Sequence, residues 1–597
     1  MFLLVNPPFA SLYRPNLGLS LLKAKLLRDG HRSQIFYADH LLAAHFKIDD
    51  YDWVHTDYEA LTGEWLFSGF VRAGGNWDEG YPELMLRRGT YTAGQIERLR
   101  RALEPLARYL DQVVDEILAR QPEVVGCSST FQQNNAALAI LKEVKRRAPN
   151  VVTVIGGANL EGELGEPVAR FPWVDYVVSG EADGCISRLY ELCSRYGSAI
   201  PEVELPEEVA TSTRKSGRGK VSDMDDLPYP DFDDFFASLE RFPELTQVKP
   251  ELALEGSRGC WWGQVKHCTF CGLNGSGMAY RSKSARRLLD EIQTLSAKYS
   301  ISLIQMVDNI IAPKHLKDLL PALVGSHLRF FWEVKANLKG AHFELLRAAG
   351  VHWVQPGIES FSENVLTLMR KGQRPIQNIF VLKAARENGI RLSWNLLMRH
   401  PGETIEDIVE QRDLAHSLMH LQPPQACCEV RPDRFSPLFA ESEGLEPFEV
   451  YSYIYEMDRG EIRKIAYLFT LGPDPRPPAY TERYATRIEA LVNKVEAWRA
   501  AWQVPERRSL HFENGGVRDR RWPGKDLVHQ LSAVETGILQ HSSQPTRISE
   551  VASAVGEGLD EGLRRLTELR LCYRDESHVL SLVLNKPSDL LPSLIGD

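Results

Sequence analysis

The stretch Arg258–Gly272, RGCWWGQVKHCTFCG, holds Cys260, Cys268 and Cys271, three of the nine cysteines in the chain. Thiolates bind soft metals, and iron–sulfur clusters are usually held by cysteine. A structural zinc site closes with four ligands. The nearby candidate for a fourth ligand, His267, adjoins Cys268 and would strain a tetrahedral arrangement. Three thiolates instead leave one iron of a [4Fe–4S] cluster open, so the pattern favours such a cluster over structural zinc or three unrelated cysteines.

The composition indicates a globular chain of several domains. Its 597 residues suffice for roughly three or four domains, and 43% of them are hydrophobic. The formal net charge of −10 argues against a general nucleic-acid binder, which is usually basic. No run approaches the roughly 18 apolar residues of a membrane span, and the start of the chain lacks a signal-peptide pattern. We therefore expect a cytoplasmic protein with no membrane segment.

Apolar runs alternate with helical patterns through the first 200 residues. This alternation predicts an α/β fold with a doubly wound, Rossmann-like parallel sheet, whose ligands bind at the carboxyl ends of the strands. The segment 41–120 interrupts the rhythm and is rich in aromatic residues. We expect it to pack over a ligand edge or a neighbouring domain. The predicted strands are 2–6, 33–39, 122–130, 151–157 and 174–181.

The remainder of the chain predicts three further parts. A polar segment, 201–247, is typical of a linker. Strand–helix units over 248–470 predict a partial (β/α)6 barrel, with its active site at the carboxyl ends of the strands. Residues 471–597 are expected to be mostly helical, with a winged-helix-like segment at 527–582. The barrel strands are expected in the runs ELALEGS, SLIQMVDN, RFFWEVKAN, WVQPGIE and RLSWNLLM.

The run CWWGQVKHCTFCGLNG, with Phe270 just before the last cysteine, resembles the cysteine loop of radical S-adenosylmethionine (SAM) enzymes. It is most similar to those that mature ribosomally made peptides, many of which are cobalamin-dependent C-methyltransferases. The resemblance covers roughly residues 1–470. Seven residues separate Cys260 from Cys268, whereas the common spacing has three. The resemblance implies a [4Fe–4S] cluster on Cys260, Cys268 and Cys271, with SAM bound at the open iron and cobalamin bound by domain 1–200.

The resemblance also implies SAM-binding positions at the ends of the barrel strands. Asp308 and its neighbour would contact the methionine amino group, Glu359 the ribose hydroxyls, and Arg399 the methionine carboxylate. The alternatives are polar strand ends, a helix N-cap for Ser360 and a surface role for Arg399. The full set of SAM candidates is Phe270, Asp308, Asn309, Lys335, Asn337, Glu359, Ser360, Asn395 and Arg399.

Small and hydroxyl residues end the predicted strands of the first domain, where they let a bulky cofactor approach the backbone. The loop after the first strand, NPPFASLYRPNLG, contains no histidine, so we expect cobalamin to bind without a lower histidine ligand. No G-x-G-x-x-G follows a strand, which disfavours a dinucleotide site; a domain without cofactor is the other alternative. The cobalamin candidates are Asn6, Pro7, Ser128, Ser129, Thr130, Gly156, Gly157, Ser179 and Glu181.

Together these features predict a radical SAM, cobalamin-dependent C-methyltransferase. The resemblance implies that it methylates an unactivated carbon of a precursor peptide and takes electrons from an external donor. One alternative is a peptide epimerase, crosslinking or rearrangement enzyme, for which Cys427 or Cys428 could donate a hydrogen atom. Another is a cobalamin-dependent DNA-binding regulator. Residues 525–597 carry four more acidic than basic residues, which disfavours DNA binding.

Overall fold

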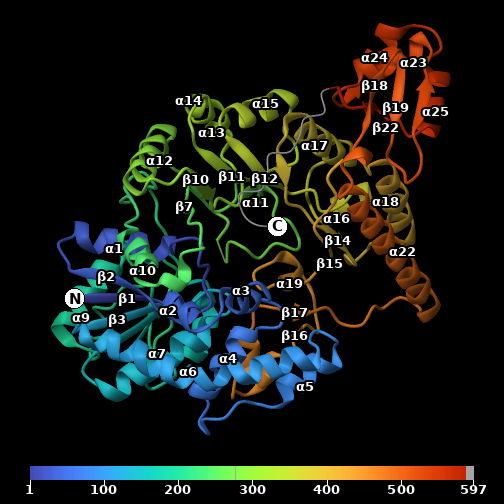
Figure 1. Ribbon diagram of the computed structural model, residues 1–597. Helices are drawn as coiled ribbons and strands as arrows, with labels where there is room; N and C mark the ends of the chain where they lie inside the picture. Colours follow the sequence, from blue (N-terminus) through green and yellow to red (C-terminus); the bar gives the residue numbers. More distant parts are fainter. Residues whose placement is uncertain (276, 586–597) are drawn as a thin grey trace. The chain divides into compact units, whose positions relative to one another are not determined.

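The computed structural model describes residues 1–275 and 277–585 and groups the chain into two compact units (Figure 1). Unit 1 comprises Met1–Ala253, Gly272–Gly277 and Arg431–Gly472. Unit 2 comprises Leu254–Cys271, Met278–Val430 and Pro473–Asp597. The chain thus leaves unit 2 directly after Cys271 and again after Val430, so each unit is built from separate stretches of sequence.

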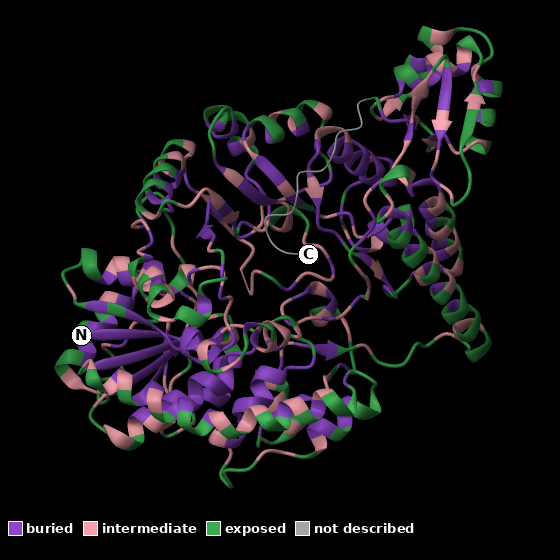
Figure 2. Cartoon of the chain, viewed as in Figure 1, coloured by how far each residue is buried: buried purple, intermediate pink, exposed green. Residues whose placement is uncertain are grey.

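Unit 1 contains the predicted doubly wound sheet. Its strand order is β2-β1-β3-β4-β5-β6, in which the first five strands are parallel and β6 is antiparallel. Side chains alternate between the faces: Leu3 and Val5 enter one core, and Phe2 and Leu4 the other. Figure 2 shows these strands as buried, as expected for a parallel sheet covered on both faces. The strands are β1 (Phe2–Asn6), β2 (Ser33–Tyr37), β3 (Val124–Ser128), β4 (Val152–Gly156), β5 (Tyr176–Val178) and β6 (Val209–Ala210).

The aromatic segment 41–120 forms helices that pack on the sheet of its own unit. Glu64 ties them to α7 (Asn134–Arg147), because its buried carboxylate accepts from the backbone N–H groups of Asn134 at 2.6 Å and Asn135 at 2.7 Å. These donors would otherwise be unsatisfied at the start of the helix. Burial raises the pKa of Glu64 to about 7. The helices are α2 (Ala38–His45), α3 (Ile48–Thr56), α4 (Thr62–Val71), α5 (Gly80–Arg87) and α6 (Ala93–Ala119).

Segment 201–247, expected as a linker, is built into unit 1. It supplies the edge strand β6 and helix α10 (Asp233–Arg241). The Nζ atom of Lys23 bonds to Asp231 at 2.9 Å and to Asp234 at 2.6 Å, which fastens the segment to α1 (Leu17–Arg28). The polar residues of this segment therefore form specific ion pairs with the rest of unit 1.

Unit 2 contains the partial barrel. Five strands have the order β13-β12-β11-β10-β7, and a parallel pair, β14 and β15, continues them through the bridge between Glu359 and Leu396. The run expected as one strand, 391–398, is divided, because β13 pairs with β12 whereas β14 pairs with β15. The strands are β7 (Leu252–Leu254), β10 (Leu303–Met306), β11 (Arg329–Val334), β12 (Val351–Pro356), β13 (Arg391–Leu392), β14 (Leu396–Met398) and β15 (Cys427–Glu429).

The C-terminal part of unit 2 is mainly helical and includes the expected winged-helix arrangement. Lys383, on α17 (Pro375–Asn388), is fully buried and donates to the carbonyl oxygens of Ser543 at 3.0 Å and Ser581 at 2.9 Å. These bonds fix the winged-helix segment to the barrel helix. Its elements are α23 (Ala533–His541), β21 (Thr546–Arg547), α24 (Ile548–Val555), α25 (Leu559–Glu568), β22 (Cys572–Arg574) and β23 (His578–Ser581).

The C-terminal part also contains a helix that agrees with the expected helical region and a sheet that was not predicted. A long helix, α22 (Pro478–Trp502), precedes a three-stranded antiparallel sheet of β18 (Leu510–Glu513), β19 (Gly516–Asp519) and β20 (Leu527–Gln530).

Across the two described ranges, none of the helices combines the length and apolar character needed to cross a bilayer.

Candidate functional site

The three cysteines of the opening stretch lie in one loop of unit 2, after β8 (Ser257–Arg258). Each is half-buried, and none forms a disulfide. Cys260 begins the short helix α11 (Trp261–Val265), where its sulfur accepts from Gly263 N at 3.3 Å. Burial raises the pKa of the Cys260 thiol, and the neighbouring Cys268 adds to this effect. Thiols that repel one another as thiolates are well suited to a shared cationic centre.

The donor set fits an iron–sulfur cluster. Nε2 of His267 lies 2.7 Å from the carbonyl oxygen of Cys271, so this nitrogen donates to the backbone. Within residues 1–275 and 277–585, no three His, Cys, Asp or Glu side chains converge on the position of a single metal ion. A cluster of several irons instead offers a separate corner to each thiolate. We therefore keep Cys260, Cys268 and Cys271 as its predicted ligands.

Several contacts hold the cysteine loop in place. Thr269, between two of the cysteines, is buried, and its hydroxyl lies 2.8 Å from Nε2 of His400. Trp262 donates from Nε1 to the carbonyl of Arg370 at 3.2 Å. Its indole lies so close to Gly372 that an added Cβ would come within 2.3 Å of the ring. The loop is thus shaped by residues about 100 positions further along the chain.

Two buried lysines place positive charge beside the thiols. Lys335 lies 3.8 Å above the Trp262 ring and donates to the carbonyl of Lys371 at 2.5 Å. Burial, together with the charge of Lys371, lowers the pKa of Lys335 to about 8. Burial also opposes the charge of Lys371, but Glu359, 3.3 Å away, and the thiols raise its pKa. Nearby cations favour thiolate over thiol, so these lysines would help the loop to bind a metal cluster.

Lys371 and Glu333 escaped the sequence analysis. Lys371 lies between two helices, outside every strand end, and its Nζ is 5.6 Å from the Phe270 ring centroid. Glu333 lies on β11, two residues before Lys335, so their side chains share a face of the sheet. Burial raises the pKa of Glu333 to about 8, and Glu359 and Asp308 add to this rise. The alternation of side chains between the two faces of β11 could have indicated Glu333, because it places Glu333 on the same face as the candidate Lys335.

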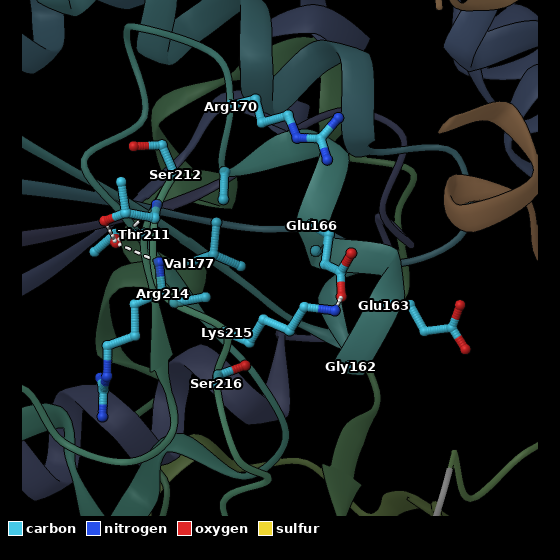
Figure 3. Close-up of a pocket in the computed structure, with 14 residues that line it drawn as sticks. Gly162, Glu163, Glu166, Arg170, Val177, Thr211, Ser212, Arg214, Lys215 and Ser216 are labelled. Carbon is cyan, nitrogen blue, oxygen red and sulfur yellow. Dashed lines mark hydrogen bonds and ion pairs between the residues drawn. The ribbon is translucent and has the colours of Figure 1, made fainter. Parts of the chain in front are cut away.

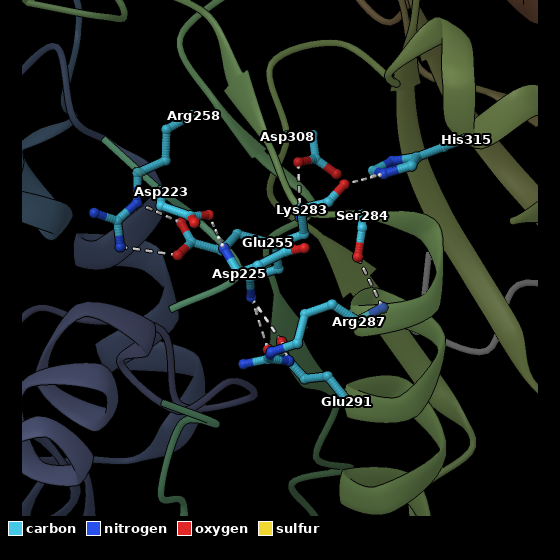
Figure 4. A network of polar contacts seen from close by, with 11 residues as sticks. Asp223, Asp225, Glu255, Arg258, Lys283, Ser284, Arg287, Glu291, Asp308 and His315 are labelled. Atoms are coloured by element: carbon cyan, nitrogen blue, oxygen red, sulfur yellow. Dashed lines mark hydrogen bonds and ion pairs between the residues drawn. The ribbon is translucent and has the colours of Figure 1, made fainter. Parts of the chain in front are cut away.

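The structure places Asp308 inside a buried polar network (Figure 4). Its carboxylate accepts from the backbone N–H of Gly256 and the hydroxyl of Ser257, both at 2.8 Å, and from Trp332 Nε1 at 3.0 Å. Burial raises its pKa to about 7. Asp308 thus joins the segment after β7 to β11, which is a structural task; contact with the methionine amino group stays a prediction. Asn309 is half-buried beside it.

The other SAM candidates differ in their surroundings. Asn337 and Asn395 are exposed. Arg399 is also exposed and is paired with Glu429 at 2.7 Å. Ser360 is fully buried and donates to Gln411 at 2.8 Å. The alternative of Ser360 as a helix N-cap is wrong, because Ser362 caps α16 (Glu363–Leu368) by accepting from Val365 N.

Glu403, from the run HPGET, is a buried carboxyl group that organises the end of β14. It accepts from the backbone N–H of Arg399 at 2.6 Å and from the hydroxyl of Tyr484. Burial raises the pKa of Glu403 to about 7. The backbone of Arg399 has a left-handed conformation, with φ of 62°, which this hydrogen bond holds in place.

Exchanging Glu403 for glutamine is expected to change the pH dependence of stability. The raised pKa means that the neutral carboxyl group contributes stability that is full below pH 4.5 and is lost as the pH rises through about 7. Glutamine keeps the acceptor oxygen but does not titrate. Between about pH 5 and about pH 8, the variant should gain on the order of 2–3 kcal/mol of unfolding free energy relative to wild type. Urea unfolding at both pH values measures this difference; a constant difference would contradict the raised pKa.

The cobalamin candidates of unit 1 meet at the carboxyl ends of β1 and β3, where the strand order reverses. Ligands of doubly wound sheets bind at such a point. Asn6 is buried, donates to Asp39 at 2.8 Å and accepts from Asn16 at 2.8 Å. Asn16 also reaches the Ser128 hydroxyl at 3.4 Å. Side chains after two different strands therefore form one polar chain across this point.

Hydrogen bonds and close backbone contacts hold the other cobalamin candidates in place. The carbonyl of Pro7 accepts from Gln133 at 2.6 Å, and the same side chain accepts from the hydroxyl of Thr130 at 2.8 Å. Gly157 has φ of 114°, and an added Cβ would meet the carbonyl oxygen of Ser129 at 2.5 Å, so glycine is required there. The candidates at the end of β5 and the remaining glycine also lie at this edge: Gly156, Ser179 and Glu181.

A pocket of about 250 Å³ lies elsewhere on unit 1, between β6 and α8 (Gly165–Val168) (Figure 3). Glu166 in this pocket is paired with Lys215 at 2.6 Å and also with Lys464. Arg170 is paired with Glu461 at 2.5 Å. Because these charges satisfy one another within the unit, we assign no ligand to the pocket.

Comparisons with known proteins identify the barrel. Residues 254–415 match the model of the radical SAM superfamily, and this stretch, with its parallel strands, is a radical SAM domain. Methyltransferases occur among both the relatives and the structural neighbours. An uncharacterized methyltransferase of Pyrococcus horikoshii is 24% identical over 300 residues, which are 48% of this chain and 62% of the relative. The match therefore spans less than two thirds of that relative's length.

Two solved structures share the fold. The radical SAM methyltransferase TsrM from Kitasatospora setae has a TM-score of 0.53 at 16% identity, over 83% of this chain and 89% of that chain. The cobalamin-dependent SAM radical enzyme OxsB has a TM-score of 0.50 at 15% identity, over 95% of this chain and 70% of that chain. These similarities confirm the predicted α/β class, with a parallel-sheet radical SAM domain and a helical C-terminal region.

Proposed function

We propose that the protein is a cobalamin-dependent radical SAM C-methyltransferase that acts on a ribosomally made peptide. The observation that carries the proposal is the placement of three thiols in one loop of a radical SAM domain, in a chain that also has a doubly wound sheet with a polar switch point. Both parts occur in a fold shared with TsrM and OxsB. The peptide substrate is supported by the likeness of the run CWWGQVKHCTFCGLNG to peptide-maturing enzymes.

The chain's residues have distinct tasks in this proposal. Cys260, Cys268 and Cys271 would hold the cluster, and Lys335 and Lys371 would favour their thiolate forms. The carboxyl edge of the unit 1 sheet, from Asn6 to Ser128, would hold cobalamin without a lower histidine ligand. When bound, the cluster with SAM supplies radical initiation and cobalamin supplies methyl transfer. The protein orients these groups and keeps water from them.

The C-terminal segment is proposed to have no nucleic-acid partner. Arg374 of α17 bonds to Asp575 at 3.0 Å, so the hairpin that would serve as a wing is fastened to the barrel helix. On α25, Arg564 is paired with Glu568 at 2.8 Å and Arg565 with Glu535 at 2.7 Å. Paired arginines contribute little to phosphate binding. A DNA-binding regulator would need basic side chains that face the nucleic acid.

The experiment that tests the proposal uses the full chain, purified without oxygen and reconstituted with iron and sulfide. It is incubated with SAM, methylcobalamin and a strong chemical reductant in place of the external electron donor. We expect both 5′-deoxyadenosine and S-adenosylhomocysteine by mass spectrometry, and one added methyl group on a candidate precursor peptide. Formation of 5′-deoxyadenosine with no bound cobalamin would contradict methyl transfer and favour an epimerase or crosslinking enzyme.

A further inference from the structure

Phe131, in the loop between β3 and α7, combines three properties that do not occur together in an ordinary surface residue. Its side chain is 72% exposed. Its backbone is left-handed, with φ of 47°, a conformation that costs energy in a bulky residue. It also follows β3 by three positions and so lies at the switch point of the unit 1 sheet. Strained and exposed apolar residues at such a place point to ligand contact.

The loop around Phe131 is rigid. Gln132 and Gln133, which follow it, are each 1% exposed. Gln132 accepts from Gly63 N at 2.7 Å and donates to the carbonyl of Val54 at 2.7 Å. Asn159 donates to the Phe131 carbonyl at 3.0 Å. The buried polar side chains of Gln132 and Gln133 therefore hold the backbone, whereas Phe131 stays exposed.

A second aromatic ring lies beside the first. Tyr58 is 44% exposed, and its ring centroid is 6.3 Å from that of Phe131, at an angle of 54°. The guanidinium of Arg431 lies 5.9 Å from the Tyr58 centroid and is itself held by Asp433 at 3.3 Å and by Glu59. Tyr58 is therefore supported from one side, and the two rings together form an open apolar surface.

We propose that Phe131, with Tyr58 beside it, is the apolar contact for the flat face of the cobalamin macrocycle. The inference rests on the proposed function, and it names residues for the cofactor that the sequence did not indicate. The location favours this occupant: the hydrogen bond from Gln133 to the Pro7 carbonyl joins the loops after β1 and β3, and Phe131 belongs to the loop after β3. A broad planar ligand at this edge would cover an exposed ring, as aromatic side chains favour.

The test is a spectroscopic titration of the full chain with hydroxocobalamin and methylcobalamin. Phe131→Ala is expected to weaken binding about tenfold, as removal of one buried ring contact does. Tyr58→Ala should weaken it by a smaller factor. Phe131→Asn keeps a residue that tolerates the left-handed backbone and should weaken binding as the alanine variant does. The matched control is Leu27→Ala. Leu27 is an apolar residue of unit 1 that is 43% exposed, and it lies in the last turn of α1, away from the switch point at the start of this helix.

The outcomes are distinguishable. If wild type binds cobalamin and both Phe131 variants bind it equally well, the inference is overturned and the proposed function stands. If wild type binds no cobalamin, the proposed function fails and this inference fails with it. Weaker binding in the Phe131 variants, unchanged binding in Leu27→Ala and unchanged thermal unfolding of all apo proteins would support the assignment.

Discussion

Replacing Cys268 by alanine is expected to abolish the proposed iron–sulfur cluster and, with it, the proposed formation of 5′-deoxyadenosine. Cys268 lies in the same loop as Cys260 and Cys271, close enough to Cys260, Lys335 and Lys371 to affect the pKa values of these groups. Removing one of the three candidate thiolates would leave the cluster with two protein ligands, too few for the loop to retain it. Iron content, the visible absorbance of the cluster and product analysis measure the effect.

The matched control for this substitution is Cys193→Ala. Cys193 is buried on α9 (Ile186–Tyr196) of unit 1, far from the cysteine loop in sequence. Its replacement removes a thiol of the same size and should leave iron content and 5′-deoxyadenosine formation unchanged. Full iron retention by Cys268→Ala would show that the cluster is held elsewhere, and loss of iron in both variants would show a general effect on folding.

Replacing Glu291 by alanine is expected to destabilise unit 2 by about 3–5 kcal/mol, the usual cost of breaking a buried ion pair by removing one partner. Glu291, on α12 (Ala285–Tyr299), is 2.7 Å from Lys283, and both side chains are completely buried (Figure 4). Arg287 also bonds to Glu291 at 2.5 Å. Without the carboxylate, the Lys283 charge stays in the interior with its main partner gone. The midpoint of urea unfolding measures the loss.

Two further variants separate this cause from general damage. In Lys283→Met/Glu291→Leu both charges are replaced by apolar groups, so the double variant should recover much of the stability that Glu291→Ala loses. Glu568→Ala removes an exposed carboxylate, paired with Arg564, and should cost at most about 1 kcal/mol. Equal losses in Glu291→Ala and Glu568→Ala would contradict the role of burial.

The elements of the fold that could be predicted are those with local patterns. Strands β1, β3 and β4 are short apolar runs bounded by turn residues, and such runs suit a sheet that is covered on both faces. The cysteine loop could be recognised in the sequence, because the residue type of the candidate ligands and the spacing between them are both local features. The strand 391–398 was predicted as continuous because nothing local marks the break between Leu392 and Leu396.

Sequence alone therefore determined the α/β class, the two sheets, the winged-helix-like segment and Cys260, Cys268 and Cys271 as candidate ligands. Tertiary structure decided which charges lie beside those thiols and which polar strand ends are used internally. Lys371 reaches the loop from about 100 residues away, and the Asp308 carboxylate accepts from three donors on other segments of unit 2. The reason is physical: a local pattern selects an element, but burial and partners depend on which distant elements pack against it.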